Sequence, residues 1–551
     1  MKSYMILCCA LVAVAQTARA QNPTIDQQIE VTRQYVPEVE GARKLDYRPR
    51  MNDTVMLKPE IDYAIRPTPW RSVFGTEPIA PVGISTAEYA RPYPYYLRLG
   101  GGYPGQSLLD FAVDKSTRTT RFGVLLNHYG EWQRRQIPVT EGASLMPWTT
   151  NDVGIYAGRD FGRQSLDFRA DLQLDYFDAF RLTDTRQGYF NQDLDVRLGY
   201  GDDFTDLSRF NYRVALSGGI AQLAVGYGRA EVNLGGRVGD GALLGDVIFD
   251  GWWTSSEASA GSCDWYVALA PRYEATFGRF GLHAGLGVYV NRYKGIRHAG
   301  DETYNDAFYR FFILPDIDLS YKVADAFVPY LRADGEQGDG SYRGQHMFNP
   351  YAQGDQVQRP RIMHFGGGFR GQAASILTYD VQVGYSLAEV LNFKLMENAW
   401  FDAFITPIDL FYVDADVKLR LPVGFSLEAG VRYNDIHPRT DRIASATEVV
   451  MPVGTGITPL LVTGAVGYAW RDKVFVKVGV EYASQRYAAT DTNLYVAVPG
   501  YVDLWAEVMF KPTRKVGVFV RGGNLLNQTN YRYLVYRALG ANVMAGATFS
   551  F

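Results

Sequence analysis

The feature that most constrains this chain is an alternation of apolar and polar side chains that recurs from about residue 94 to the C-terminus. In residues 411–420, one set is Phe411, Val413, Ala415, Val417 and Leu419, and the other is Tyr412, Asp414, Asp416, Lys418 and Arg420. Residues 425–434, 473–482 and 502–510 repeat the pattern. Successive side chains of a β-strand point to opposite faces, so this period of two predicts strands rather than helices.

The alternation also bears on how the chain could cross a membrane. Past residue 20, no segment has the roughly 18 uninterrupted apolar residues that a membrane-spanning helix requires. A sheet can cross only as a closed barrel, because an open edge leaves backbone polar groups unsatisfied in lipid. Short turns such as 470–473 and 511–515 alternate with long polar segments such as 130–151, 337–361 and 524–540. Outer-membrane barrels alternate periplasmic turns and extracellular loops in this way.

We therefore expect an all-β fold, a transmembrane antiparallel β-barrel in the outer membrane, surrounded by lipid. An even strand number is the rule for such barrels, and the pattern predicts twenty-two. It is weakest between residues 190 and 252, where it would also allow a total of twenty. The predicted strands begin near residues 94, 106, 119, 152, 163, 190, 207, 225, 243, 263, 278, 308, 326, 362, 375, 406, 422, 458, 473, 498, 514 and 540.

The last fifty residues carry a family pattern. It consists of the strand 516–523, the run Asn524-Leu525-Leu526-Asn527-Gln528, Tyr531, and a closing strand 540–551 that ends on Phe551. This stretch resembles the end of a TonB-dependent receptor barrel. The resemblance implies that the Asn-Leu run starts the last extracellular loop and that the outer-membrane assembly machinery recognises the strand ending in Phe551. It also implies a role in uptake across the outer membrane.

The residues before the barrel divide into two predicted segments. Residues 1–20 have the features of a signal peptide: Lys2, an apolar core, and the cleavage pattern Ala18-Arg19-Ala20. Residues 21–92 hold prolines that oppose both sheet interiors and long helices. These prolines are Pro23, Pro37, Pro49, Pro59, Pro67, Pro69, Pro78, Pro81 and Pro92. We expect an extended periplasmic segment with at most one short helix near residues 36–45, followed by the barrel over residues 93–551.

Residues 21–92 depart from the resemblance, because TonB-dependent receptors carry a much longer plug domain in this place. The sequence therefore predicts a barrel without a standard plug. Ile29-Glu30-Val31-Thr32 faintly resembles the short strand that such receptors lend to TonB. The alternative is a segment that lies across the barrel mouth or docks on a periplasmic or outer-membrane protein.

The histidines, cysteines and glycine motifs of the sequence do not form a recognisable metal-binding, catalytic or nucleotide-binding site. The histidines are His128, His283, His298, His346, His364 and His437; none has zinc-ligand spacing, and we expect His283 to line the lumen. Cys263 is the one cysteine after the signal peptide, which excludes an intrachain disulfide. The Gly366-x-Gly368-x-x-Gly371 match to a dinucleotide fingerprint lies in a predicted strand, outside the βαβ context that the fingerprint requires.

The acidic run Asp334, Glu336 and Asp339 could bind Ca²⁺ in an extracellular loop, or it could be a solvated acidic loop, which is the simpler interpretation. We accordingly predict no catalytic, cofactor-binding or metal-binding residues, no cofactor and no enzyme activity. An outer-membrane protease or lipase whose Ser, His and Asp come together in space from loop or rim residues would escape this reasoning. A net charge of −4, with basic residues scattered, gives no reason to expect a nucleic-acid partner.

Two functions fit these features. The first is a receptor-like or porin-like transport barrel whose wide lumen is filled by residues 21–92 and by infolded loops, because an open lumen of this size would leak solutes. The second is a structural or accessory barrel subunit of an outer-membrane protein complex that does not transport.

Overall fold

The computed structural model describes residues 93–136, 143–180, 186–221, 225–254, 263–299, 302–353, 357, 359–374, 376–396, 400–439, 457–490, 495–534 and 536–551. Four predictions lie outside these residues. They are the signal peptide, the proline-rich segment 21–92, the TonB-box-like run 29–32 and the short helix near 36–45.

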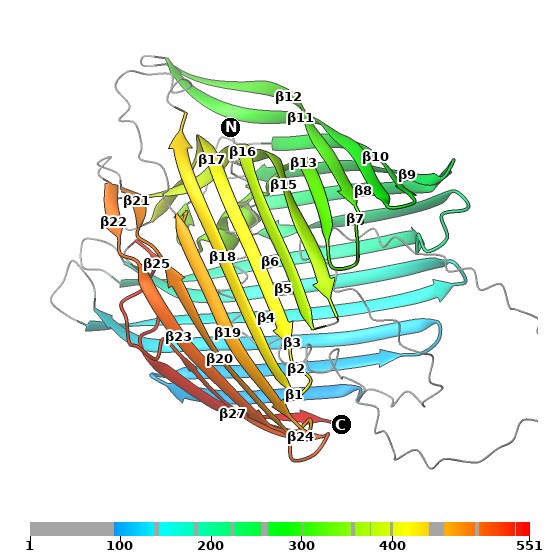
Figure 1. Ribbon diagram of the computed structural model, residues 1–551. Coiled ribbons are helices and arrows are strands. Elements are labelled where there is room, and N and C mark those ends of the chain that lie inside the picture. Colours follow the sequence, from blue (N-terminus) through cyan, green and yellow to red (C-terminus); the bar gives the residue numbers. More distant parts are fainter. Residues whose placement is uncertain are drawn as a thin grey trace, which may run out of the picture.

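The described chain forms a closed, antiparallel 22-strand β-barrel (Figure 1). The barrel strands are β1 (Tyr95–Tyr103), β2 (Gln106–Ser116), β3 (Thr120–Gln136), β4 (Ala143–Phe161), β5 (Gln164–Phe180), β6 (Arg186–Asp202), β7 (Asn211–Ala221), β8 (Val225–Val238), β9 (Gly241–Thr254), β10 (Cys263–Phe277) and β11 (Phe280–Ala299). They continue with β12 (Glu302–Tyr321), β13 (Val328–Gln337), β15 (Arg361–Ala373), β16 (Leu377–Leu395), β17 (Phe401–Arg420), β18 (Phe425–Pro438), β19 (Leu460–Trp470), β20 (Val474–Ala483), β23 (Tyr501–Phe510), β24 (Val516–Gly523) and β27 (Asn542–Ser550).

The ring closes between its first and last strands. β27 pairs with β1, and Leu97 lies opposite Phe549. Tyr95 and Phe551 exchange two backbone hydrogen bonds of 3.1 and 3.0 Å, and their rings stack with centroids 5.3 Å apart. The predicted closure by the C-terminal strand is confirmed, and the seam leaves no open sheet edge for lipid to meet.

The strand number and most strand starts agree with the prediction from alternation. The largest difference is at β4, which begins at Ala143 rather than near residue 152. We predicted a loop over residues 130–151, but β3 and β4 pair continuously from Thr120↔Arg159 to Gln136↔Ala143. The hydrogen-bonded ladder needs only backbone groups, so it continues past the point where the apolar alternation ends.

The two faces of the barrel differ as the alternation predicts. On β6, Leu194, Val196 and Leu198 are outward and exposed, whereas Asp193, next to Leu194, is buried inside. On β17, Phe411 and Val417 are exposed outward, and Tyr412 is 1% exposed inside. Large apolar side chains on the outer surface of a closed barrel are the expected lining toward lipid.

Smaller elements lie in the connections at the end of the barrel opposite Phe551, which we call the loop end; the other end is the turn end. These elements are α3 (Tyr342–Phe348), β14 (Ala352–Gln353), β21 (Arg486–Thr490), β22 (Tyr495–Val498), β25 (Tyr531–Tyr533) and β26 (Tyr536–Arg537). β14 and β21 pair in parallel with the loop-end residues of β17 and β16. Among the described residues, no helix is both long enough and apolar enough to span a membrane.

Candidate transport lumen

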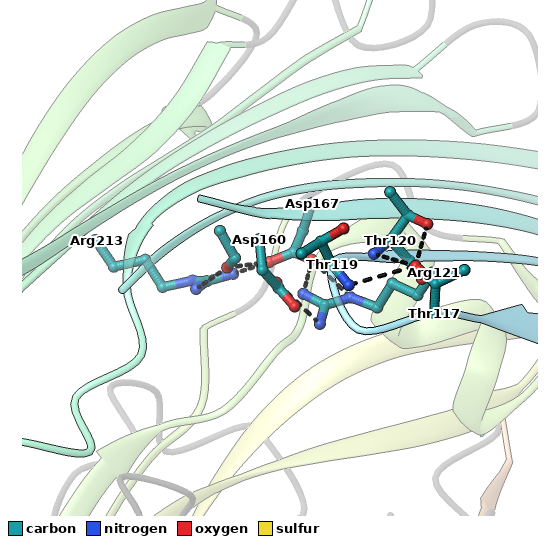
Figure 2. A network of polar contacts seen from close by, with 8 residues as sticks. Thr117, Thr119, Thr120, Arg121, Asp160, Asp167 and Arg213 are labelled. Atoms are coloured by element: carbon teal, nitrogen blue, oxygen red, sulfur yellow. Dashed lines mark hydrogen bonds and ion pairs between the residues drawn. The ribbon is translucent and has the colours of Figure 1, made fainter. Parts of the chain in front are cut away.

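The luminal wall near the turn end carries a row of ion pairs across β3, β5 and β7 (Figure 2). Asp167 accepts hydrogen bonds from Arg121 on one side and Arg213 on the other. Ser165 donates to the same carboxylate at 3.0 Å, and Asp160 lies 3.5 Å from Arg121. Each charge therefore has a partner of opposite sign, although the row remains partly open to the lumen.

The row can form because glycines occupy the strands between its members. Gly158 on β4 lies opposite both Arg121 and Asp167 in register. A Cβ atom on Gly158 would come within 2.4 Å of Arg121 Nε and 2.8 Å of Asp167 Oδ1. Gly199 has the equivalent place on β6, opposite Asp167. Because glycines occupy the intervening strands, long charged side chains on alternate strands can form hydrogen bonds across them.

Similar pairs continue around the wall, so the lumen is charged but locally balanced. The pairs are Arg332–Asp318 at 3.0 Å, Arg432–Asp414 at 2.9 Å, Lys477–Glu428 at 2.8 Å and His283–Asp316 at 3.1 Å. The predicted luminal place of His283 is confirmed.

The described part of the connection between β13 and β15, residues 338–353, 357, 359 and 360, folds into the barrel, and we call it the luminal segment. Its helix α3 is capped by Ser341, whose Oγ accepts a hydrogen bond from Gly344 N at 3.1 Å. Asp339 accepts from Ser341 N at 2.9 Å, and Gln345 Nε2 donates to Gly340 O at 2.9 Å. Burial lowers the pKa of His346 in α3, which favours its neutral form. These local bonds make the segment compact.

Two arginines tie the luminal segment to the wall across the lumen. Arg343 Nε lies 2.7 Å from Asp193 Oδ2 on β6, and Arg343 donates to the Tyr227 hydroxyl on β8 at 3.2 Å. Arg359, which is 3% exposed, pairs with Asp250 on β9 at 3.2 Å. The segment leaves from β13 and returns to β15, so contacts with β6 to β9 require it to cross the barrel interior.

An aromatic cluster holds the middle of the luminal segment. The Tyr351 ring stacks on Tyr536 of the last loop with centroids 3.6 Å apart, and it meets Phe177 of β5 edge-on at 5.0 Å. Tyr533 donates to Phe348 O at 3.1 Å, and Phe401 N of β17 donates to Tyr351 O at 2.9 Å. The segment thus joins distant parts of the wall with the last loop, and it partly fills the lumen at the loop end.

The Asn-Leu run begins the last loop, as its resemblance implied. Asn524 has a φ of 43° and Asn527 a φ of 51°, left-handed values that asparagine tolerates better than most residues. The Asn524 side-chain amide donates to Gln528 O at 2.7 Å and Leu539 O at 3.0 Å. The run therefore ties together both ends of the loop that supplies Tyr533 and Tyr536.

The glycine motif and the acidic run both lie at least partly in barrel strands. The Gly366-x-Gly368-x-x-Gly371 run lies in β15, as predicted. The acidic run was wrongly assigned to an extracellular loop: Asp334 and Glu336 lie in β13, because the inward alternation of Tyr330 and Arg332 continues through them, and only Asp339 follows the strand. No group of three or more His, Cys, Asp or Glu side chains within the described ranges could hold a metal ion.

Sequence reasoning predicted infolded loops in the lumen but did not identify the connection after β13 as one of them. Its anchoring contacts, such as Arg343 with Asp193 and Arg359 with Asp250, join residues more than a hundred positions apart. The only local signal was the unusual length of the connection after β13.

A closed barrel of this size, with an apolar exterior, a charged lumen and an infolded segment, has the architecture of an outer-membrane β-barrel. Comparison with protein-family models finds no match, and neither does comparison with curated protein sequences.

Solved structures with the same fold are found. The FrpB iron transporter from Neisseria meningitidis (F5-1 variant) superposes with a TM-score of 0.64 at 10% identity, over 84% of this chain and 83% of that one. The copper transporter OprC gives 0.61 at 10% identity, over 84% and 81%. The siderophore receptor PiuA from Acinetobacter baumannii gives 0.59 at 9% identity, over 83% and 82%. At such identities the likeness establishes the fold.

Proposed function

We propose that this barrel moves a solute across the outer membrane through a lumen gated by the luminal segment. The observation that carries the proposal is the crossing of the lumen by the luminal segment, held by Arg343, Arg359 and Tyr351. A purely structural barrel has no evident need for a wide, charged interior that a segment anchored to the wall partly fills. The solved structures of the same fold, described by their titles as transporters and receptors, support the same function.

An ion pair and an aromatic contact both hold the luminal segment, and each can be removed by a single substitution. Arg343→Met removes the ion pair with Asp193 while keeping an unbranched side chain of similar length. Tyr351→Ala removes the ring that stacks on Tyr536. Arg209 is a matched control, because it is 62% exposed in the turn between β6 and β7 and pairs only locally with Asp206 in the described contacts.

The test is ion conductance of the full chain in planar lipid bilayers. We expect a low or rarely open state for the wild type, and a clear rise in open conductance for Arg343→Met and Tyr351→Ala. Arg209→Met should behave like the wild type. Heat-dependent gel migration verifies that each variant is a folded barrel. If all four proteins are equally sealed, gating by the luminal segment is wrong. An accessory subunit that co-purifies with stable partners would then be the better account.

We also propose that residues 1–20 are a signal peptide and that residues 21–92 form a proline-rich periplasmic segment in place of a standard plug. The proline density of residues 21–92 supports this division. The mass of the mature protein should correspond to a chain that starts at Gln21. Removing residues 21–92 should leave a folded barrel, whereas loss of barrel folding would show that they belong to the barrel domain.

A further inference from the structure

The strands β2, β3 and β4 are neighbours in the barrel wall (Figure 1). A polar cluster lies on their outer surface, next to the apolar side chains that face outward. Nearer the turn end, the outward side chains of these strands are apolar: Leu109, Phe111, Val113, Phe122, Val124, Leu126, Val153 and Ile155. Phe122 and Ile155 are 47% and 41% exposed. The next outward residues toward the loop end are Ser107, His128 and Asn151.

The cluster therefore lies where the apolar band ends at the loop end of the barrel. In an outer-membrane barrel, this is the level at which the hydrocarbon of the outer leaflet gives way to polar lipid groups. The ester linkages of membrane lipids lie at the same boundary. A polar cluster here faces lipid esters rather than the lumen.

Strand register brings the three side chains together. His128 lies directly opposite Asn151, and Leu109 lies opposite His128, which puts Ser107 on the diagonal. Ser107 Oγ is 2.8 Å from His128 Nε2, and His128 Nδ1 is 2.7 Å from Asn151 Oδ1. Each ring nitrogen thus has a different partner, as in a serine–histidine pair oriented by a third residue.

The hydrogen-bond network determines the direction of each bond. The Asn151 amide nitrogen donates to the backbone oxygen of Leu174 at 3.0 Å, and that oxygen can only accept. The Asn151 oxygen therefore faces His128 and accepts from it, so Nδ1 carries the proton. In the neutral ring Nε2 then has a free lone pair, and it accepts the hydrogen bond that the Ser107 hydroxyl donates. His128 is placed as a base toward Ser107.

Ser107 is half-buried on the outer surface, beside Gly130 and the Trp132 ring. Gly130 lies on the same outward face, and a Cβ there would come within 2.7 Å of Ser107 Oγ and 2.5 Å of the Trp132 ring. Glycine at this position allows the Trp132 ring to lie next to Ser107 Oγ. Trp132 is 39% exposed and its ring centroid is 6.5 Å from that of His128, so an apolar ring borders the cluster on the loop side.

We propose that Ser107, His128 and Asn151 are the nucleophile, general base and orienting residue of a hydrolase that cleaves acyl esters of outer-leaflet lipids. Ser107 Oγ attacks the ester carbonyl carbon as His128 Nε2 takes the hydroxyl proton. The bond from that carbon to the lipid alcohol oxygen breaks, and His128 returns the proton to this oxygen. Water then attacks the acyl-serine by the same proton relay, which releases the fatty acid and restores Ser107.

Ser386 provides a matched control. Its Oγ lies 2.7 Å from His364 Nδ1, so it too contacts a histidine, but it is fully buried on the inner face of β16, away from lipid. Ser386→Ala should leave any lipid hydrolysis unchanged. Asn151→Asp keeps an oxygen acceptor for His128 Nδ1, whereas Asn151→Ala does not.

The test uses the purified, folded full chain in detergent, with a fluorophosphonate probe and two lipid substrates. We expect the probe to label Ser107, and fatty acid to be released from glycerophospholipid micelles or from lipid A. Ser107→Ala should abolish labelling, and His128→Gln should lower both rates by about 10²–10⁴-fold. Asn151→Asp should retain more activity than Asn151→Ala, a rescue that a purely structural role would not give. Whichever lipid is cleaved identifies the natural source of the ester.

Absence of labelling and of lipid hydrolysis would overturn the proposal. If folded wild-type protein leaves Ser107 unlabelled and releases no more fatty acid from either lipid than Ser107→Ala, the cluster is only a polar anchor at the lipid boundary and the proposal is wrong. Heat-dependent gel migration separates loss of activity from loss of folding. Because the conductance experiment tests the lumen, the two proposals can fail independently.

Discussion

At the residue scale, the luminal wall depends on side chains that interact across a strand rather than along one. Arg121, Asp167 and Arg213 lie on alternate strands, and Gly158 and Gly199 leave the intervening positions empty. A glycine in a strand interior weakens the strand locally. Here that cost is offset by charge-assisted hydrogen bonds, which a side chain at Gly158 would obstruct.

Gly158→Ala tests this arrangement, because its new Cβ would overlap Arg121 Nε and Asp167 Oδ1. We expect it to destabilise the barrel by about 1 kcal/mol, toward the low end for overpacking because both side chains can move. Gly245→Ala is the control, since the nearest atom to its Cβ is 3.9 Å away. Denaturant titrations in detergent give both values. Equal stability of the two variants would show that Gly158 is not needed for the ion pairs.

Residue-level sites were the least predictable part of this chain. The sequence shows His128 and Asn151 as two polar residues 23 positions apart, and Ser107 as 21 positions from His128. Only the register of β2, β3 and β4 makes them neighbours. A search by local spacing therefore found no serine–histidine cluster, although strand alternation alone would have placed His128 on the outward face with Leu126 and Val124.

At the scale of elements, the strands were predictable and the luminal segment was not. Strand starts could be predicted because apolar and polar side chains alternate within each strand. Where a strand extends beyond the lipid, backbone pairing alone continues it, so the side chains there show no alternation. The luminal segment is held by Asp193, Asp250 and Tyr536, which come from widely separated parts of the chain. Such non-local contacts have no signature in a single segment.

The contact of Arg359 with Asp250 tests how firmly this segment is held. The Arg359 side chain is 3% exposed and that of Asp250 12% exposed, so Arg359→Met leaves a carboxylate buried without its cation. We expect a loss of about 3 kcal/mol, and recovery of most of it in the Arg359→Met, Asp250→Asn double variant. Unfolding followed by tryptophan fluorescence measures both. Additive losses in the double variant would mean that the two side chains do not depend on each other.

At the scale of the whole molecule, one physical claim underlies the fold, the proposed transport and the proposed lipid hydrolysis. Outward side chains meet hydrocarbon, and inward side chains meet a charged interior. The exposed Phe411 and Val417 and the inward Tyr412 on β17 are one instance of it. Closure between β1 and β27 follows, because a sheet in lipid cannot keep an open edge.

The most direct measurement is a cysteine scan of β17 in lipid vesicles, in a Cys263→Ser background. Spin labels on single cysteines replacing Phe411, Val413 and Ala415 should be accessible to oxygen dissolved in the bilayer. Labels replacing Asp414, Asp416 and Lys418 should respond instead to a water-soluble nickel complex, or to neither reagent where the interior is packed. A period of two in these accessibilities is the predicted result, and equal access of the nickel complex to all six positions would contradict it.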